Sequence, residues 1–177
     1  PDIEVITTNL DGVPEQAAGL VTVRRLTPPG RVLLPRLWER PDRHTLSPEE
    51  FRKLFPNEVY NDEDDCTTWP EGDTVLSDSF ETPRKSSISG LRKLQPGNYV
   101  LKITTSDPFG KPVEHTHYFT LFSPAEGKTV AVEPLTVTLL TPQAEPGETA
   151  SLLIATPIRK AWVTLSLFSK NGKPRPI

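Results

Sequence analysis

The segment 94–122 constrains the fold of this chain more than any other part of its sequence. It holds two runs of alternating apolar and polar residues, 98–106 and 113–122, separated by Asp107-Pro108-Phe109-Gly110. Alternation with a period of two is typical of half-buried strands, and Asp, Pro and Gly together favour a tight turn. The segment therefore predicts a β-hairpin of an antiparallel sandwich.

Tyr99 opens the first of these strands and shares one strand face with Leu101 and Ile103. Because Tyr99 closely follows Pro96-Gly97, the pattern is similar to the tyrosine corner of immunoglobulin-like sandwiches, in which a Tyr hydroxyl binds the backbone of the loop before it. The alternative is a plain strand that begins with an aromatic residue. Both interpretations predict a sandwich.

Other segments show a strand-like pattern as well. They are 3–10, 20–26, 74–80, 135–140, 150–155 and 161–168. Asp11-Gly12-Val13-Pro14 predicts a turn that joins the first two into a second hairpin, and 170–173 (Lys-Asn-Gly-Lys) predicts a turn after the last.

The strand pattern weakens near 124–133, so we expect a domain boundary there. Residues 1–128 would form one sandwich, and 129–177 would form the start of a second, similar one. A sandwich of this type needs about seven strands, so the second is expected to be truncated or to complete a sheet elsewhere. The start at Pro1-Asp2, without Met or a leader, suggests a chain cut from a longer protein.

Charge and composition exclude several classes of protein. A net charge of -3 and a pI near 5.7 provide no basic field for nucleic acid. No apolar run is long enough to cross a bilayer, so no transmembrane segment is expected. A single cysteine, Cys66, excludes an internal disulfide and a Cys-based zinc site. Neighbouring acids disfavour its thiolate, so it is expected to be passive.

Segment 27–73 interrupts the strand pattern and contains the signals of a short helix within 46–56. Ser47 is the expected N-cap, Pro48 suits the first helical position, and Glu50 completes a capping box. Negative charge near a helix N-terminus is also favourable. The sequence predicts a helical insertion in the first sandwich.

The expected helix carries Phe51, Leu54 and Phe55 on one face, and Pro56 ends it. So short a helix does not persist alone in water. We therefore expect its apolar face to pack on the sandwich. Neighbouring aromatic residues, Trp38, Tyr60 and Trp69, are expected to hold the insertion in place.

The insertion carries a resemblance to a known family. The runs 36–43 (Arg-Leu-Trp-Glu-Arg-Pro-Asp-Arg), 47–51 and 60–65, followed by Trp69, resemble the inserted region in early macroglobulin-like domains of bacterial alpha-2-macroglobulin-like proteins. Segment 133–154 resembles the start of the next such domain. From the first of these stretches to the last, the resemblance extends over residues 36–154. Cys66 stands where proline is expected.

The resemblance implies an antiparallel immunoglobulin- or fibronectin III-like β-sandwich in a broad-spectrum protease trap. It implies a noncatalytic structural segment without a cofactor, whose partners are neighbouring domains and, for the whole protein, target proteases. It also implies a periplasmic, cell-surface or secreted location, with a lipid anchor as one form of attachment. The thioester motif of the family, Cys-Gly-Glu-Gln, is not matched, because Thr67-Thr68-Trp69 follows Cys66.

The acidic run 61–65 supplies oxygen ligands of the kind that calcium prefers, with Asp62, Asp64 and Asp65 as candidates. An EF-hand loop needs Gly at its sixth position, where Cys66 stands. The alternative is a solvated loop whose carboxylates pair with nearby arginines. These are Arg24, Arg25, Arg31, Arg36, Arg40 and Arg43.

His115 and His117 project from one strand face and form a candidate metal pair. The alternative is the polar end of a half-buried face. Four acidic residues near Trp38 and Trp69 suggest a sugar hydrolase, which pairs two acids beside aromatic side chains. The position of Glu49 and Glu50 at a helix N-terminus opposes this interpretation. The four acidic residues are Glu39, Asp42, Glu49 and Glu50.

A second function from another class is a free-standing carbohydrate-binding or adhesive sandwich. Trp38, Trp69 and Trp162 would then serve as stacking platforms. The two functions differ in where these side chains should lie, since a scaffold buries them and a lectin exposes two or more in a row.

Overall fold

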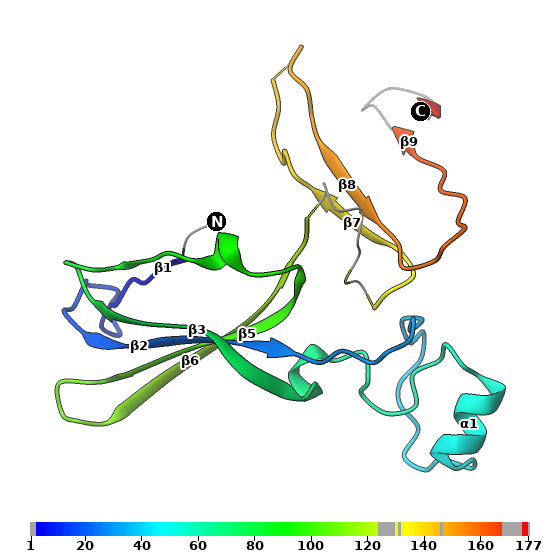
Figure 1. The fold of residues 1–177 in the computed structure, drawn as a ribbon, viewed down its shortest axis with the longest axis horizontal. Coiled ribbons are helices and arrows are strands. Elements are labelled where there is room, and N and C mark those ends of the chain that lie inside the picture. Colours follow the sequence, from blue (N-terminus) through cyan, green and yellow to red (C-terminus); the bar gives the residue numbers. More distant parts are fainter. Residues whose placement is uncertain (1–2, 124–129, 131, 146, 168–174, 177) are drawn as a thin grey trace.

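The computed structural model describes residues 3–123, 130, 132–145, 147–167, 175 and 176, and it is mostly antiparallel β structure (Figure 1). The strands are β1 (Ile3–Glu4), β2 (Ala18–Leu26), β3 (Glu71–Glu81), β4 (Ser87–Ile88), β5 (Gly97–Ser106), β6 (Pro112–Leu121), β7 (Thr136–Leu139), β8 (Leu152–Ala155), β9 (Ser166–Leu167) and β10 (Arg175–Pro176). One α-helix, α1 (Pro48–Leu54), and two short 3-10 helices, Cys66–Thr68 and Leu91–Lys93, complete the described elements. In that part of the chain, no helix has the length and hydropathy needed to span a bilayer.

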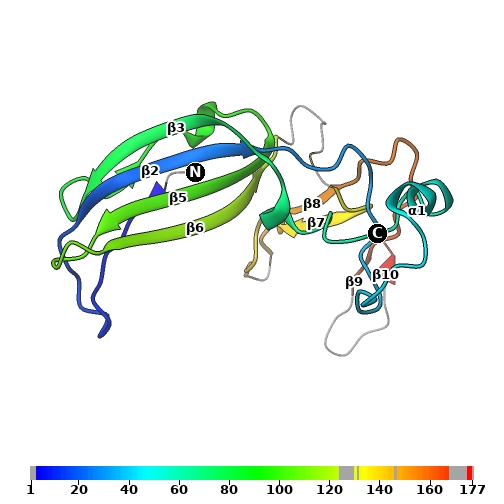
Figure 2. The same ribbon diagram turned by 90° about the horizontal axis from the view of Figure 1, so that it is seen from below.

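The main sheet has four strands in the order β3-β2-β5-β6, which Figure 2 shows side by side. The predicted β5–β6 hairpin is confirmed, with continuous register from Gly97↔Leu121 to Ser106↔Pro112. At its turn, Asp107 Oδ1 accepts hydrogen bonds from the backbone N–H groups two and four residues later, at 2.9 and 2.8 Å. Gly110 supplies the positive φ of 80° that this turn requires.

A second antiparallel pair, β1 with β4, contributes to a core shared with the main sheet. The buried residues of this shared core are Val5, Val21, Val23, Phe80, Ile88, Leu91, Tyr99 and Leu101. Six of these residues lie on strands of the two sheets, Val5 directly follows β1, and Leu91 lies in the second 3-10 helix. An amphipathic sheet hides its apolar face against a second layer in this way. The coarse expectation of an antiparallel, mostly β fold is therefore confirmed.

The tyrosine corner is confirmed at Tyr99, which is 1% exposed. Its hydroxyl donates to the carbonyl oxygen of Gln95 at 2.6 Å, and its ring stacks on Phe119 with centroids 5.6 Å apart. The buried ring and its hydrogen bond thus fix the loop before β5 to the core.

The predicted hairpin between 3–10 and 20–26 is wrong. β1 pairs with β4, and β2 lies between β3 and β5. The turn itself forms, because Asn9 Oδ1 accepts from two backbone N–H groups and a bridge joins Thr8 to Pro14. It reverses the chain locally, and the strand before it is then free to pair with β4.

The insertion leaves and returns at the end of the β2–β3 pair, where Leu26 pairs with Glu71 and the N–H of Thr27 donates to Pro70 O at 3.0 Å. The structure therefore ends the insertion at residue 70, before the predicted 73, because β3 begins at Glu71. The last predicted residues of the insertion belong to the sheet.

Helix α1 has the predicted capping box. The Ser47 hydroxyl accepts from the N–H of Glu50 at 3.3 Å, and the Glu50 carboxylate accepts from the N–H of Ser47 at 3.0 Å. The expected packing of the helix on the sandwich is wrong, because Leu54 is 61% and Phe55 45% exposed. Instead, Phe51 packs edge-on against Tyr60, so the helix closes on its own insertion.

The C-terminal part contains two short antiparallel pairs, β7 with β8 and β9 with β10. The strands predicted at 135–140 and 150–155 are confirmed as β7 and β8. Of 161–168, only Ser166–Leu167 forms a strand in the described part of the chain, and the turn predicted at 170–173 lies outside the described residues. Most of the expected boundary segment, 124–133, also lies outside them, so the domain division stays a prediction.

Candidate functional site

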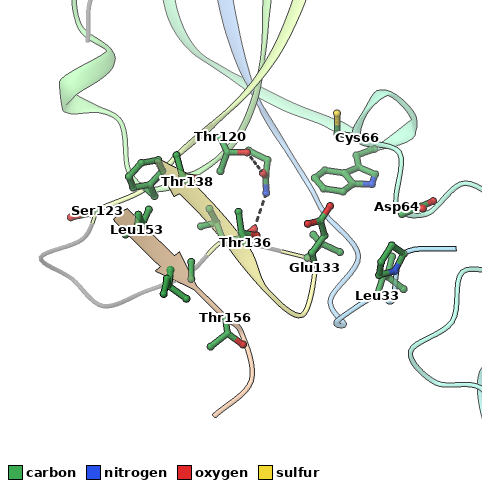
Figure 3. Close-up of a pocket in the computed structure, with 18 residues that line it drawn as sticks. Leu33, Asp64, Cys66, Thr120, Ser123, Glu133, Thr136, Thr138, Leu153 and Thr156 are labelled. Atoms are coloured by element: carbon green, nitrogen blue, oxygen red, sulfur yellow. Dashed lines mark hydrogen bonds between the residues drawn. The ribbon is translucent and has the colours of Figure 1, made fainter. Parts of the chain in front are cut away.

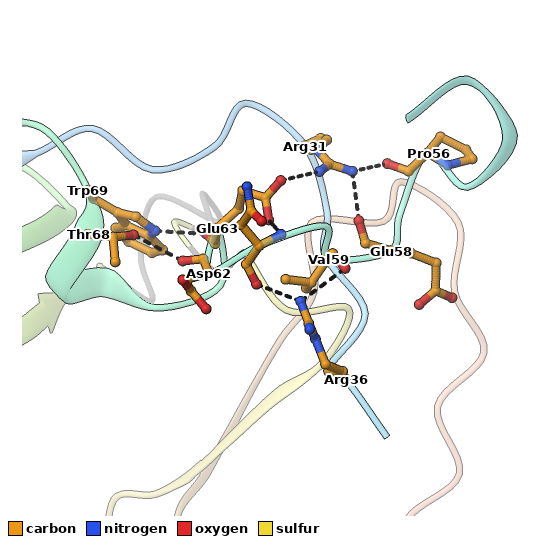
Figure 4. A network of polar contacts seen from close by, with 10 residues as sticks. Arg31, Arg36, Pro56, Glu58, Val59, Asp62, Glu63, Thr68 and Trp69 are labelled. Atoms are coloured by element: carbon orange, nitrogen blue, oxygen red, sulfur yellow. Dashed lines mark hydrogen bonds and ion pairs between the residues drawn. The ribbon is translucent and has the colours of Figure 1, made fainter. Parts of the chain in front are cut away.

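Arg31 anchors the insertion by holding the segment that follows α1 (Figure 4). Its Nη1 donates to Pro56 O at 2.5 Å and to Glu58 O at 3.2 Å, and its Nη2 lies 3.5 Å from Glu63 Oε1. A planar guanidinium can serve several acceptors at once, whereas an ammonium is a compact point charge. Arg31 thus supplies donors to carbonyl groups that no strand partner reaches.

Arg36 repeats this arrangement further along the same segment. Its Nη2 donates to Val59 O at 3.2 Å and to Asn61 O at 2.5 Å. Val59 is itself buried, at 7% exposed. We call Arg31 and Arg36, with the carbonyl groups they bind in 56–61, the arginine clamp.

Residues of the insertion itself bind the acidic run 61–65. Asp62 pairs with Arg40 at 2.5 Å, and Asp65 Oδ1 caps the 3-10 helix by accepting from the N–H of Thr67 at 2.9 Å. Hydrogen bonding from Thr67 lowers the pKa of the Asp65 carboxyl. The Trp69 indole donates to the carbonyl of Glu63 at 2.9 Å, which closes the loop.

The six arginines divide into three groups. Arg31 and Arg40 pair with the acidic run as expected, and Arg36 binds its backbone. Arg24 of β2 pairs with Glu71 of β3, and Arg25 of β2 donates to Pro96 O directly before β5. For Arg43, no ion pair with the run occurs among the described residues.

Neither metal hypothesis is supported by a cluster of ligand side chains among the described residues. Within that part of the chain, no group of three or more His, Cys, Asp or Glu side chains has the geometry to hold a metal ion. Asp62 and Asp65 make the contacts given above, whereas Asp64 lines a pocket. His115 and His117 are exposed on β6, and the His117 ring stacks on Phe119. Calcium at the acidic run and a metal at the histidine pair stay untested predictions.

A pocket of about 790 Å³ lies where the insertion, one end of the main sheet and the β7–β8 pair meet (Figure 3). Glu133 lies between Asp64 on the insertion side and Thr136 on β7. Apolar side chains, among them Leu33 and Leu153, form much of the remaining wall. The lining therefore combines hydroxyl and carboxylate groups with apolar surface.

Two hydrogen bonds connect the three parts around the pocket. The Asn98 Nδ2 group of β5 donates to Val130 O at 3.3 Å, and the N–H of Leu33 in the insertion donates to Val132 O at 2.9 Å. Asn98 is 8% exposed, and its Oδ1 accepts from Thr120 Oγ1 at 2.9 Å. We call these contacts the junction, since they hold the chain before β7 against both the sheet and the insertion.

Cys66 lines the pocket, and its environment disfavours the thiolate form. Burial raises the pKa of its thiol, and the neighbouring Asp65 carboxylate raises it further. Of the acids considered for hydrolysis, Glu50 is committed to the helix cap, and its hydrogen bonds with Ser47 lower its pKa. The expectation that Glu50 completes the helix cap agrees with these contacts.

The three tryptophans differ in environment. Trp69 is half-buried, whereas Trp38 is 67% exposed and Trp162 is fully exposed. The expectation that Trp38 pins the insertion is therefore wrong, because the arginine clamp, Tyr60 and Trp69 perform that role. Tyr60 contributes through its hydroxyl, which donates to Leu46 O at 2.8 Å.

Sequence patterns did not identify Asn98 or Leu33 as junction residues, nor the carbonyl groups as ligands of the clamp. Every residue has a carbonyl group, so nothing in a sequence marks the ones that an arginine will bind. One signal in the sequence was the polar Asn98 directly before the apolar run 99–101.

The chain was compared with protein-family models, with curated proteins and with solved structures, and none of the three comparisons found a match.

Proposed function

We propose that this chain is a noncatalytic structural segment of a bacterial alpha-2-macroglobulin-like protein, a broad-spectrum protease trap of the cell envelope. The junction is the observation that carries the proposal. Asn98 of the sheet and Leu33 of the insertion both hold the backbone that leads to β7. A segment whose task is to pass a rearrangement from one domain to the next needs such a fixed connection.

Two further features support the macroglobulin-like assignment. The tyrosine corner at Tyr99 and the four-strand order β3-β2-β5-β6 are compatible with an immunoglobulin- or fibronectin III-like sandwich. The insertion is held by backbone-directed arginines, which suits a structural role better than a catalytic one. In this proposal the partners are neighbouring domains and the trapped proteases, outside the cytoplasm.

The test uses the natural protein, recovered from cells with an antibody raised against the 177-residue chain. It is mixed with a bacterial serine protease, and cleavage of casein and of a small chromogenic peptide is followed in parallel. A trap shields the protease from casein while the peptide is still cleaved. Equal loss of both activities, or loss of neither at molar excess of the protein, would overturn the proposal.

The junction is tested in the same assay. Asn98→Ala removes the side chain that binds Val130 O and is expected to lower the fraction of shielded protease. Thr116→Ala, at an exposed position on β6, is the matched control and should leave shielding unchanged. If the two variants shielded the protease from casein equally well, the junction would have no part in trapping.

A carbohydrate-binding or adhesive module is the second candidate, because Trp38 and Trp162 are exposed. They lie on separate segments, the insertion and the C-terminal part, with the half-buried Trp69 as the third. Affinity electrophoresis in soluble polysaccharides tests this function. Retardation that Trp38→Ala or Trp162→Ala abolishes would favour it, whereas unchanged migration in every polysaccharide would count against it.

A further inference from the structure

His115 and His117 of β6 lie on the core-facing side of the main sheet. Their partners across β5 are Ile103 and Leu101, and the same face continues to Phe119, which packs against the core. Both histidines are nevertheless exposed, so the rings are accessible to a ligand. Residues two apart on a strand are separated by about 7 Å, a spacing from which both rings can reach one metal ion.

A single copy of the chain supplies this pair with only two ligands. The neighbours on β5 are apolar, and the part of the chain that the structure describes holds no third His, Cys, Asp or Glu placed to complete a metal site. Zinc bound to imidazole nitrogens prefers four ligands in a tetrahedral arrangement. A zinc ion at this pair therefore needs ligands from the other side of β6.

That other side of β6 is an edge of the main sheet (Figure 2). Among the described strands, β5 is the one that pairs with β6. An edge strand presents N–H and C=O groups that can pair with another chain, and charged residues or irregular register discourage such pairing. β6 pairs with β5 over ten residues without a shift in register, and Glu114 is its one charged residue. β3, at the opposite edge, has four acidic residues and a shifted register with β2. β6 is therefore the edge more open to a partner strand.

Two copies of β6 are complementary to each other when they pair antiparallel about Thr116. In that register His115 lies opposite the partner's His117, and His117 lies opposite the partner's His115. Glu114 lies opposite the partner's Tyr118, so no like charges meet. A shift by two residues in either direction would set one histidine of each copy opposite an apolar residue. Only the register about Thr116 pairs every histidine of β6 with another histidine.

This register brings four imidazole rings together on one face of the joined sheets. Residues directly opposite each other in antiparallel strands have Cβ atoms about 4.5–5.5 Å apart. Rings from neighbouring positions can then converge on a tetrahedral ion with Zn–N bonds of about 2.0–2.1 Å.

We propose that Zn²⁺ joins two copies of this chain edge to edge through β6, with His115 and His117 of both copies as its four ligands. The site is incomplete without the second copy, because each copy contributes half of the ligands. The proposal goes beyond the proposed function and does not depend on it.

Sedimentation velocity of the 177-residue chain, prepared without an affinity tag, tests this proposal. In EDTA the chain should sediment as a monomer of 19.7 kDa. Added Zn²⁺ should convert it to a species of twice that mass, with saturation at one ion for every two chains. Zinc uptake by a chain that stays monomeric, a dimer that persists in EDTA, or a lack of zinc uptake would each overturn the proposal.

A matched pair of variants assigns the ligands. His115→Ala removes one ligand from each copy and is expected to abolish the zinc-dependent dimer. His44→Ala removes the histidine that stacks on Tyr60 in the insertion and should leave the dimer intact. Far-UV circular dichroism should report an unchanged fold for His115→Ala, because that side chain is exposed. Equal dimer formation by the two variants would overturn the proposal.

Hydrogen exchange distinguishes edge-to-edge pairing from a contact of the histidine rings alone. Zn²⁺ should slow the exchange of the β6 amide groups that point away from β5. Amide groups of β2, which already lies between β3 and β5, should exchange at the same rate with and without the ion. A zinc-dependent dimer with unchanged exchange in β6 would overturn the edge-to-edge arrangement.

Discussion

Gly19 of β2 lies where the two neighbouring strands leave no room for a side chain. A Cβ atom at this position would collide with the backbone oxygen of Thr104 on β5 and approach the Phe80 ring on β3 to 2.8 and 2.9 Å. Phe80 is 2% exposed and belongs to the core. Relief therefore requires movement of a paired strand, a core ring, or both.

Gly19→Ala should destabilise the protein for these reasons. Overpacking of a core typically costs about 1–3 kcal/mol, and a weakened ladder hydrogen bond adds about 1 kcal/mol. Alanine in a strand would otherwise be favoured over glycine by about 0.5–1 kcal/mol. The expected loss in the free energy of unfolding is thus about 1–3.5 kcal/mol.

Urea denaturation followed by circular dichroism measures this loss, with Gly30→Ala as the matched control. Gly30 has open space around the position of a Cβ, so the same substitution there should change the free energy of unfolding by less than about 0.5 kcal/mol. If Gly19→Ala were as stable as wild type, the close approach of β5 and Phe80 would be wrong.

Three shorter predictions concern single groups. Tyr99→Phe removes only the hydroxyl of the tyrosine corner and should lower the free energy of unfolding by about 1 kcal/mol, measured in urea. The hydrogen bond from Lys102 holds the pKa of Glu71 below its ordinary 4.5, so its stabilisation is present above that pH and is lost as the pH falls through the lowered pKa. Glu71→Gln should therefore flatten the decline of the urea midpoint below pH 4.5. Cys66 should react with iodoacetamide more slowly than free cysteine at pH 8, and Asp65→Asn should speed the reaction, because it removes one cause of the raised thiol pKa.

Each of these has a matched comparison. Tyr118→Phe removes a hydroxyl that forms no hydrogen bond within the described residues, and a loss equal to that of Tyr99→Phe would contradict the corner. Glu114→Gln is the control for the pH series, since Glu114 forms no ion pair in that part of the chain. If the urea midpoint declined below pH 4.5 in the same way in the Glu71→Gln and Glu114→Gln variants, Glu71 would not be a cause of that decline. For Cys66, alkylation as fast as that of free cysteine would contradict the raised thiol pKa.

The features that sequence patterns predicted correctly are local. The β5–β6 hairpin, the Ser47–Glu50 capping box and the Tyr99–Gln95 hydrogen bond each join residues close together along the chain or across one turn. Their geometry depends on spacing and residue type, which the sequence states directly. The coarse fold class follows, because alternating apolar residues need a second layer.

The errors concern partners that are distant in the sequence. β1 pairs with residues 87–88 rather than with the next strand, and this choice depends on which edge the folded core leaves open. The apolar face of α1 was expected on the sandwich because Leu54 and Phe55 are apolar. It closes locally instead, because the arginine clamp already fixes the insertion and Phe51 and Tyr60 pack together.

The sequence by itself determined an antiparallel β chain with a capped helix in an insertion, because period-two alternation, turn residues and capping residues act over short distances. Only the tertiary structure decided how the insertion is held and where the junction lies. Those choices rest on arginine and asparagine side chains that bind backbone carbonyl groups 25 to 32 residues away. Carbonyl groups are the same in every residue, so their partners emerge only once the chain has folded.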